Sequence, residues 1–142
     1  MPIELGQCHY EECSDGKILH YLTNPSIAST RLVGSDWNAR KLLDEIASSS
    51  PHFNALLDVG ALITGMSNYD VAKYLVERLP EDLFDGVVFL DSADRQMILL
   101  RQGKNVVRLN QAGIPPRKRF AFYDQIHTTG ENFYHFFTSL QV

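Results

Sequence analysis

The chain has 142 residues, of which 44% are hydrophobic and 21% are charged, and its formal net charge is -4. Its length and composition are those of one ordinary globular domain, which argues against a disordered, collagen-like or coiled-coil protein. The negative charge argues against a dedicated nucleic-acid-binding surface, because phosphate contacts require clustered Lys and Arg. The sequence contains no apolar run of the roughly 18 residues that a membrane span needs, so we expect no membrane partner.

The cysteines and the N-terminus predict the cellular compartment. The chain has two cysteines, Cys8 and Cys13, which allow at most one disulfide. The first residues lack the basic region and long apolar stretch of a signal peptide. We therefore expect a reduced, intracellular and cytoplasmic protein.

The N-terminal quarter of the chain is poorly defined by pattern. We treat residues 1–35 as a separate N-terminal segment and residues 36–142 as an α/β domain. Within the N-terminal segment, residues 18–22 favour a short strand, which the turn formers Asn24 and Pro25 would end.

The α/β domain is predicted to begin with a helix over residues 39–47. Apolar side chains recur there at i, i+3, i+4, i+7 and i+8, and Ser35 or Asp36 is the expected N-cap. A second helix should start at Ser67, because Asp70 three positions later completes a capping box.

Strands and a hairpin account for most of the remaining domain. The predicted strands and the hairpin between them, in chain order, are residues 53–59, 86–91, 96–109 (the hairpin) and 120–124. A strand, a helix and a strand in succession form a βαβ unit with parallel strands. The sequence thus predicts an α/β fold: a mainly parallel sheet with flanking helices and an inserted β-hairpin.

Polar residues follow three of these strands, beginning at Asp58, Asp91 and Asp124. In open α/β sheets, ligands bind beyond the carboxyl ends of the strands. The same residue types are common in turns and caps, and pattern alone favours that explanation.

The string around Asp91 and Asp94 superficially resembles the acidic box of ATPases. The sequence lacks a G-x-x-x-x-G-K-[ST] phosphate loop, so we interpret this string as a turn.

His127 is the most specific candidate for chemistry. Asp124 stands three residues before it, in a loop with Thr128, Thr129 and Gly130. A carboxylate can orient an imidazole for acid–base catalysis or for contact with phosphate. A histidine whose ring is satisfied by a turn carbonyl explains the spacing equally well.

Cys8 and Cys13 are candidates for a thiol nucleophile, which needs a nearby histidine and a group that orients it. The surrounding acids Glu11, Glu12 and Asp15 act to raise a thiol pKa, which opposes activation. We interpret both cysteines as incidental or structural. Their spacing from the histidines does not match a zinc finger, so no metal site is expected.

Three strings resemble consecutive blocks of one family: LDVGALITGMSN (57–68), FDGVVFLDSADR (84–95) and RFAFYDQIHTTG (119–130). The family consists of very large, mostly fungal and protist proteins described as ubiquitin thioesterases, or ubiquitinyl hydrolases. The resemblance implies a cysteine-type deubiquitinase that hydrolyses at the C-terminal glycine of ubiquitin. Its implied partners are ubiquitin or ubiquitinated proteins.

The same blocks also resemble the second RecA-like half of a helicase-type motor. In the family, a phosphate-loop segment lies far upstream. The last block resembles the loop that couples nucleotide to the neighbouring domain in the bacterial preprotein translocase ATPase. This resemblance implies an inter-domain role for six residues: Asp124, Gln125, His127, Thr128, Thr129 and Gly130. ATP and Mg²⁺ are then expected only together with a phosphate-loop domain.

The sequence departs from the family pattern after Gly130. The family continues with a Met-Asp-Ile-like string and an Arg-containing block, whereas Glu131, Asn132 and Phe133 stand here. We therefore expect a fragment of a larger protein, or a truncated one, that is inactive alone and whose parent protein is itself a partner. A motor half-domain and a non-catalytic interaction module are the alternatives to a hydrolase.

Overall fold

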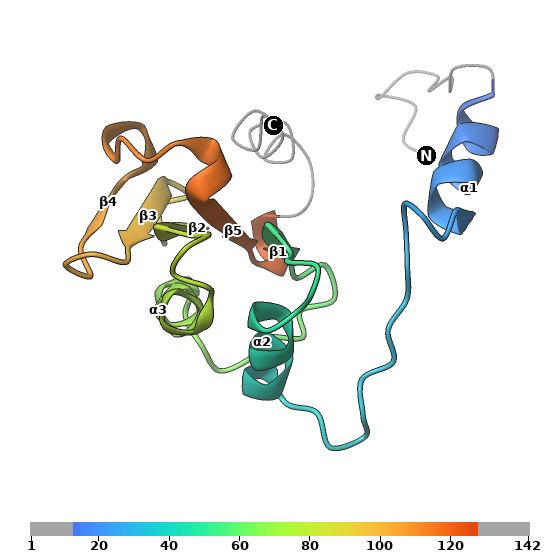
Figure 1. Cartoon of the computed structure of the whole chain (residues 1–142), viewed down its shortest axis with the longest axis horizontal. Helices are drawn as coiled ribbons and strands as arrows, with labels where there is room; N and C mark the ends of the chain where they lie inside the picture. The colour runs from blue at the N-terminus through green and yellow to red at the C-terminus, as the bar shows by residue number, and fades with distance from the viewer. Residues whose placement is uncertain (1–12, 128–142) are drawn as a thin grey trace, which may run out of the picture. The chain divides into compact units, whose positions relative to one another are not determined.

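The computed structural model describes residues 13–127 and divides the chain into two compact units, Met1–Ser35 and Asp36–Val142. The described part of the first unit contains helix α1 (Ser14–Thr23), drawn in blue in Figure 1. The predicted strand over residues 18–22 is therefore wrong. Short apolar runs fit either period, and here Ile18, Leu19 and Leu22 have helical spacing.

The second unit is built on a five-stranded open sheet with the order β1-β5-β2-β3-β4 (Figure 1). The strands are β1 (Ala55–Leu57), β2 (Gly86–Leu90), β3 (Gln96–Leu100), β4 (Val106–Arg108) and β5 (Arg119–Tyr123). β1, β5 and β2 are parallel, β3 pairs antiparallel with β2, and β4 pairs antiparallel with β3. The α/β class and the hairpin are confirmed. The sheet is mixed rather than mainly parallel, because the hairpin continues the same sheet.

The last described strand, β5, lies between β1 and β2. Its neighbours on both sides are parallel to it, and four of its five residues are buried. Such a strand reads as a continuous apolar run because both of its faces are covered. This position makes β5 the centre of the parallel part of the sheet.

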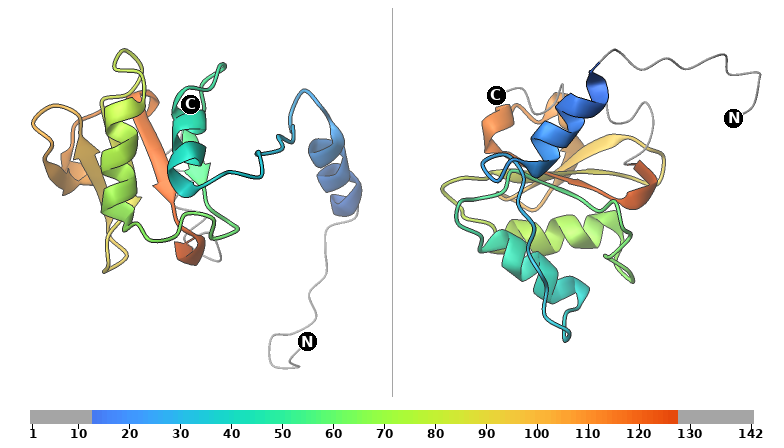
Figure 2. Two further views of the ribbon diagram at one scale, coloured as in Figure 1. Left: turned by 90° about the horizontal axis from the view of Figure 1, so that it is seen from below. Right: turned by 90° about the vertical axis from the view of Figure 1, so that its right-hand side faces the viewer.

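Helices α2 (Ala39–Ala47) and α3 (Asn68–Arg78) cover one face of the sheet (Figure 2). The N-cap of α2 is Asn38, whose side chain accepts the backbone N–H of Lys41 at 3.0 Å. The predicted cap at Ser35 or Asp36 is wrong, because only the residue directly before the first helical turn can reach these amides. Asp36 instead forms an ion pair with Lys41.

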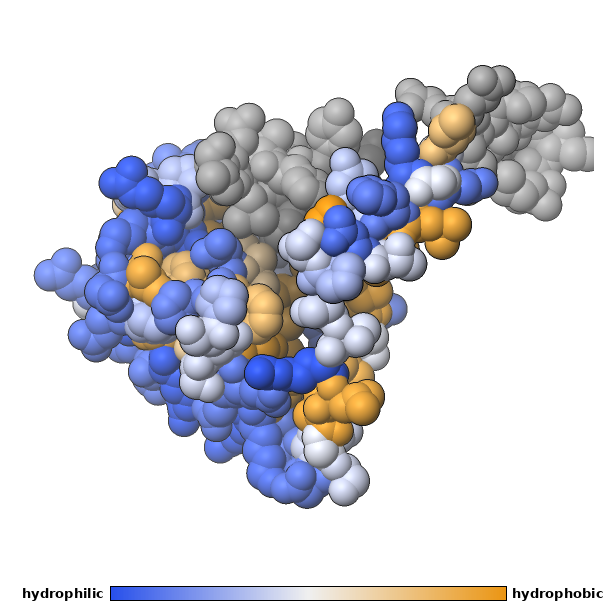
Figure 3. Space-filling view, turned by 45° about the vertical axis from the view of Figure 1, so that its right-hand side comes forward, coloured by the Kyte–Doolittle hydropathy of each residue, from blue (hydrophilic) through white to orange (hydrophobic). Residues whose placement is uncertain are grey.

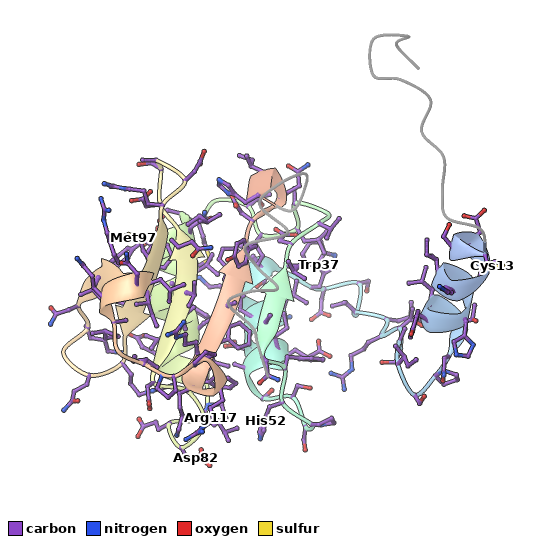
Figure 4. All side chains as sticks on the ribbon, turned by 90° about the horizontal axis from the view of Figure 1, so that it is seen from above. Cys13, Trp37, His52, Asp82, Met97 and Arg117 are labelled. Carbon is purple, nitrogen blue, oxygen red and sulfur yellow. The ribbon has the colours of Figure 1, made fainter. Side chains whose placement is uncertain are left out.

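Each face of the sheet carries its own apolar core. The core under the helices includes Leu43, Val71, Ala72, Leu75, Val76, Phe84, Val87, Phe89, Leu99, Phe120 and Phe122. The core on the opposite face includes Val88, Leu90, Ile98, Leu109, Ala121 and Tyr123. The segment that contains the 3₁₀ helices η2 (Leu109–Gln111) and η3 (Pro116–Lys118) packs on this second face, toward the viewer in Figure 4.

Basic residues anchor that segment. Lys118 donates from Nζ to the carbonyl of Asp82 at 2.6 Å, and Arg119 donates from Nε to the carbonyl of Ile114 at 2.7 Å. Two basic side chains thus hold backbone carbonyls. None of the helices within residues 13–127 is long and apolar enough to cross a membrane. The face drawn in Figure 3 is mainly hydrophilic, with separate apolar patches.

The start of α3 is a capping box, as predicted. The Ser67 hydroxyl accepts the N–H of Asp70 at 3.1 Å, and the Asp70 carboxylate accepts the N–H of Ser67 at 3.2 Å. We expect Ser67→Ala to lower the free energy of unfolding by about 1 kcal/mol, because the amide of Asp70 loses its acceptor. Urea denaturation measures the loss. Ser92→Ala, at the exposed turn after β2, is the matched control, and an equal loss in both variants would contradict the capping role.

Candidate functional site

The carboxyl ends of β1, β5 and β2 meet at one edge of the sheet because these strands are parallel. Leu57 pairs with Tyr123, so Asp58 and Asp124 follow at the same level. We call Asp58–Ile63, Asp91–Arg95 and Asp124–His127 the carboxyl-edge loops. Loops at this edge are the usual place for ligands in α/β sheets.

Asp58 is buried and serves the loop that follows it. Its Oδ1 accepts the N–H of Leu62 at 2.8 Å, and its Oδ2 accepts the N–H of Ile63 at 2.9 Å. Its own N–H donates to the carbonyl of Tyr123 at 2.9 Å, which ties the loop to β5. Both carboxylate oxygens therefore accept backbone hydrogen bonds, and Asp58 stabilises its own turn.

Asp91 likewise shapes the turn between β2 and β3. Its Oδ1 accepts the backbone N–H of Ala93 at 2.9 Å and that of Arg95 at 3.0 Å, and its Oδ2 accepts Nε of Arg95 at 2.8 Å. The hydrogen bonds from the side chain and the backbone of Arg95 lower the pKa of Asp91 to about 2. Asp91 is thus an ionised turn residue, as the sequence pattern predicted.

Asp94 occupies an unusual backbone position in the same turn. Its φ is +57°, in the left-handed region that non-glycine residues seldom adopt and that Asp tolerates better than most. From there its carboxylate reaches His127, 33 positions later in the chain. Sequence reasoning missed this contact, although it identified Asp94 as part of the turn.

His127 lies between two carboxylates. The short 3₁₀ helix η4 (Gln125–His127) turns the ring back so that Nδ1 is hydrogen-bonded with Oδ1 of Asp124. The other nitrogen, Nε2, lies 2.8 Å from Oδ1 of Asp94. The residue is buried, with 7% of its surface exposed. The pairing of Asp124 with His127, one of the two arrangements that the spacing allowed, is present, and Asp94 is its third member.

This geometry favours the protonated imidazole. A neutral ring has one N–H, so its second nitrogen would direct a lone pair at a carboxylate oxygen. Burial acts to lower the pKa of His127, but the hydrogen bonds and charges of Asp124 and Asp94 outweigh it, and the pKa lies above the ordinary 6.5. In this arrangement neither ring nitrogen is free to take a proton from a substrate, which argues against His127 as a general base.

A pocket of about 500 Å³ opens beside His127. Its walls come from the start of α3, the end of β2 and the loops that follow β2 and β5. The lining residues are Ser67, Asn68, Tyr69, Phe89, Leu90, Asp91, Ser92, Asp94, Asp124, Ile126 and His127. Asn68 donates from Nδ2 to the carbonyl of Leu90 at 3.0 Å, which fixes α3 against the end of β2. Pockets that combine apolar walls, a few polar groups and a residue with a shifted pKa are the usual candidates for ligand sites.

The remaining candidates are Cys13, which belongs to the first unit, and residues that are not described. Cys13, labelled in Figure 4, precedes α1 and is exposed. Cys8, Thr128, Thr129 and Gly130 lie outside the described residues. Of the six residues assigned to the inter-domain loop, Asp124, Gln125 and His127 are described.

No metal ligands are assigned. Within residues 13–127, no group of three or more His, Cys, Asp or Glu side chains is arranged to hold a metal ion. The carboxylates of Asp58 and Asp91 are occupied by hydrogen bonds, and Asp94 and Asp124 each engage His127.

The fold class is therefore α/β with a mixed open sheet, and the candidate site is the carboxyl edge of its three parallel strands. No protein-family model, curated protein or solved structure matches this chain.

Proposed function

We propose that the second unit acts as a RecA-like half-domain of a nucleotide-dependent motor within a ubiquitin thioesterase-like protein. One observation carries the proposal. The three blocks that resemble the family, residues 57–68, 84–95 and 119–130, each contain one strand end and its carboxyl-edge loop. Segments far apart in sequence thus share one edge, where α/β proteins bind ligands.

The charges of this edge indicate what it contributes. Protonated His127 between Asp94 and Asp124 leaves one net negative charge, Asp58 adds a second, and Asp91 is compensated by Arg95. Such an edge repels a bare phosphate. The phosphates would therefore be held by a separate phosphate-loop domain, with Mg²⁺ as their counter-ion, and the carboxyl-edge loops would contact the ligand from the other side.

Nuclear magnetic resonance (NMR) of the ¹⁵N-labelled chain titrated with Mg·ATP tests this proposal. We expect dissociation constants in the millimolar range, because the chain has no phosphate loop, and shift changes concentrated in residues 91–95 and 124–127. Mg²⁺ alone and Mg·tripolyphosphate are the controls. Changes near the opposite edge, around Asp85 and Lys118, or no change at about 10 mM would contradict the motor role and favour the interaction module.

Ubiquitin hydrolysis, which the resemblance implies, needs a thiolate with a histidine partner. Cys13 is a free, exposed thiol, and no hydrogen bond joins it to a histidine among the described residues of its own unit. We therefore propose that the hydrolytic site lies outside residues 13–127. Ubiquitin with a C-terminal electrophile should leave Cys13 unmodified, whereas iodoacetamide should modify this exposed thiol. Mass spectrometry of the adducts measures both reactions. A ubiquitin adduct on Cys13 would contradict the proposal. An adduct on Cys8 would favour a ubiquitin hydrolase whose nucleophile belongs to this chain.

A further inference from the structure

We propose that His127 is a pH-operated latch that holds the turn after β2 to the loop after β5. The latch consists of one buried ring and two carboxylates: Nδ1 with Asp124, and Nε2 with Asp94 at 2.8 Å. Asp94 and His127 are 33 positions apart and belong to loops that follow neighbouring parallel strands. The ring is therefore a side-chain link between two elements of the candidate site.

The closed latch depends on the proton. In the imidazolium form both nitrogens donate to carboxylates, which are charge-assisted hydrogen bonds. After deprotonation one nitrogen lone pair opposes a carboxylate oxygen, and the two acids lose the charge between them. The side chain of Asp94 is 72% exposed and that of Asp124 is 24% exposed. Water can solvate Asp94 more readily, so the latch opens on the Asp94 side.

Few other charges face the ring. The turn after β2 contributes Asp91 and Arg95, which neutralise each other at 2.7 Å. The start of α3 contributes Ser67, Asn68 and Tyr69, which carry no charge at neutral pH, and Ile126 is apolar. Among the described residues that line the pocket, Asp94 and Asp124 therefore determine how the ring responds to pH.

Opening changes the walls of two pockets. Asp94 lines both the pocket beside His127 and a second pocket of about 330 Å³ that Leu90, Leu109 and Tyr123 also line. The two pockets share Leu90 and Asp94, and release of Asp94 removes the charged one of these two side chains. The latch would thus widen the carboxyl-edge site as pH rises, whatever ligand the site accepts.

The sign of the pH dependence follows from the geometry. A histidine whose pKa is higher in the folded than in the unfolded protein stabilises the fold fully below about 6.5, and this stabilisation is lost as pH rises through the folded pKa. For each unit by which the folded pKa exceeds the unfolded one, the folding constant falls about tenfold across this window.

Unfolding of the full chain between pH 5 and pH 9 tests the latch, together with exchange of the Asp94 and His127 amides. We expect the wild type and the control His52→Gln, at an exposed histidine, to lose stability with rising pH. In His127→Gln the loss of stability with rising pH should be absent. In Asp94→Asn this loss should be smaller, and hydrogen exchange of the amides in the turn after β2 should be faster. Asp94 is exposed, so its variant folds even if His127→Gln does not. Identical pH profiles in the wild type and Asp94→Asn would overturn the proposal.

Discussion

Replacing Phe120 with alanine is expected to lower the free energy of unfolding by about 3–5 kcal/mol. Phe120 is fully buried in β5, the middle strand of the parallel part of the sheet, and its ring meets the ring of Phe84 edge to face, with centroids 5.6 Å apart. The truncation removes a large apolar contact and leaves a cavity between the sheet and the helices. Since a domain is stable by only about 5–15 kcal/mol, this single change removes a large share of the stability.

Urea denaturation monitored by circular dichroism measures the effect. Phe53→Ala is the matched control, because 49% of Phe53 is exposed and it lies just before β1. We expect the control to cost well under half as much as Phe120→Ala. A loss below about 1 kcal/mol for Phe120→Ala would mean that β5 is not the buried centre of the parallel part of the sheet.

Asp58→Ala is expected to cost about 2–3 kcal/mol, the largest effect of any acid at the carboxyl edge. The buried carboxylate accepts two backbone N–H groups, those of Leu62 and Ile63, at 2.8 and 2.9 Å. Without it these donors lose their acceptors in a partly buried loop. Asp58→Asn should cost less, because one amide oxygen remains to accept.

Thermal or urea unfolding of the two Asp58 variants measures this difference. Asp82→Ala is the control for loss of an exposed carboxylate, and its backbone carbonyl still accepts from Lys118. Equal, small losses in Asp58→Ala and Asp82→Ala would show that the Asp58 carboxylate does not hold the loop. In that case it would be available for a ligand.

Elements set by local pattern were predicted well. The capping box at Ser67, the apolar run of β2 and the hairpin of β3 and β4 each depend on residues close in sequence. The strand order was not predicted, because the position of β5 between β1 and β2 depends on contacts far apart in the chain. The prediction of a strand over residues 18–22 was wrong for another reason, because a short apolar run fits a helix or a strand equally well.

The candidate site divides in the same way. The pairing of Asp124 with His127 is one of the two arrangements that their three-residue spacing allowed. The contact with Asp94 needs two things that no local pattern gives: β5 beside β2, and a left-handed backbone at Asp94. Asp58 and Asp91 were correctly placed at strand ends, but their carboxylates serve their own turns.

The protonation state of the His127 ring at neutral pH tests the central claim most directly. Two-dimensional ¹H–¹⁵N NMR of the imidazole shows which ring nitrogens carry protons. We predict that both Nδ1 and Nε2 are protonated and that the ring titrates above 6.5, because Asp124 and Asp94 each accept one hydrogen bond from it. A ring that already loses its second proton below pH 6.5 would contradict the charged link between the two loops.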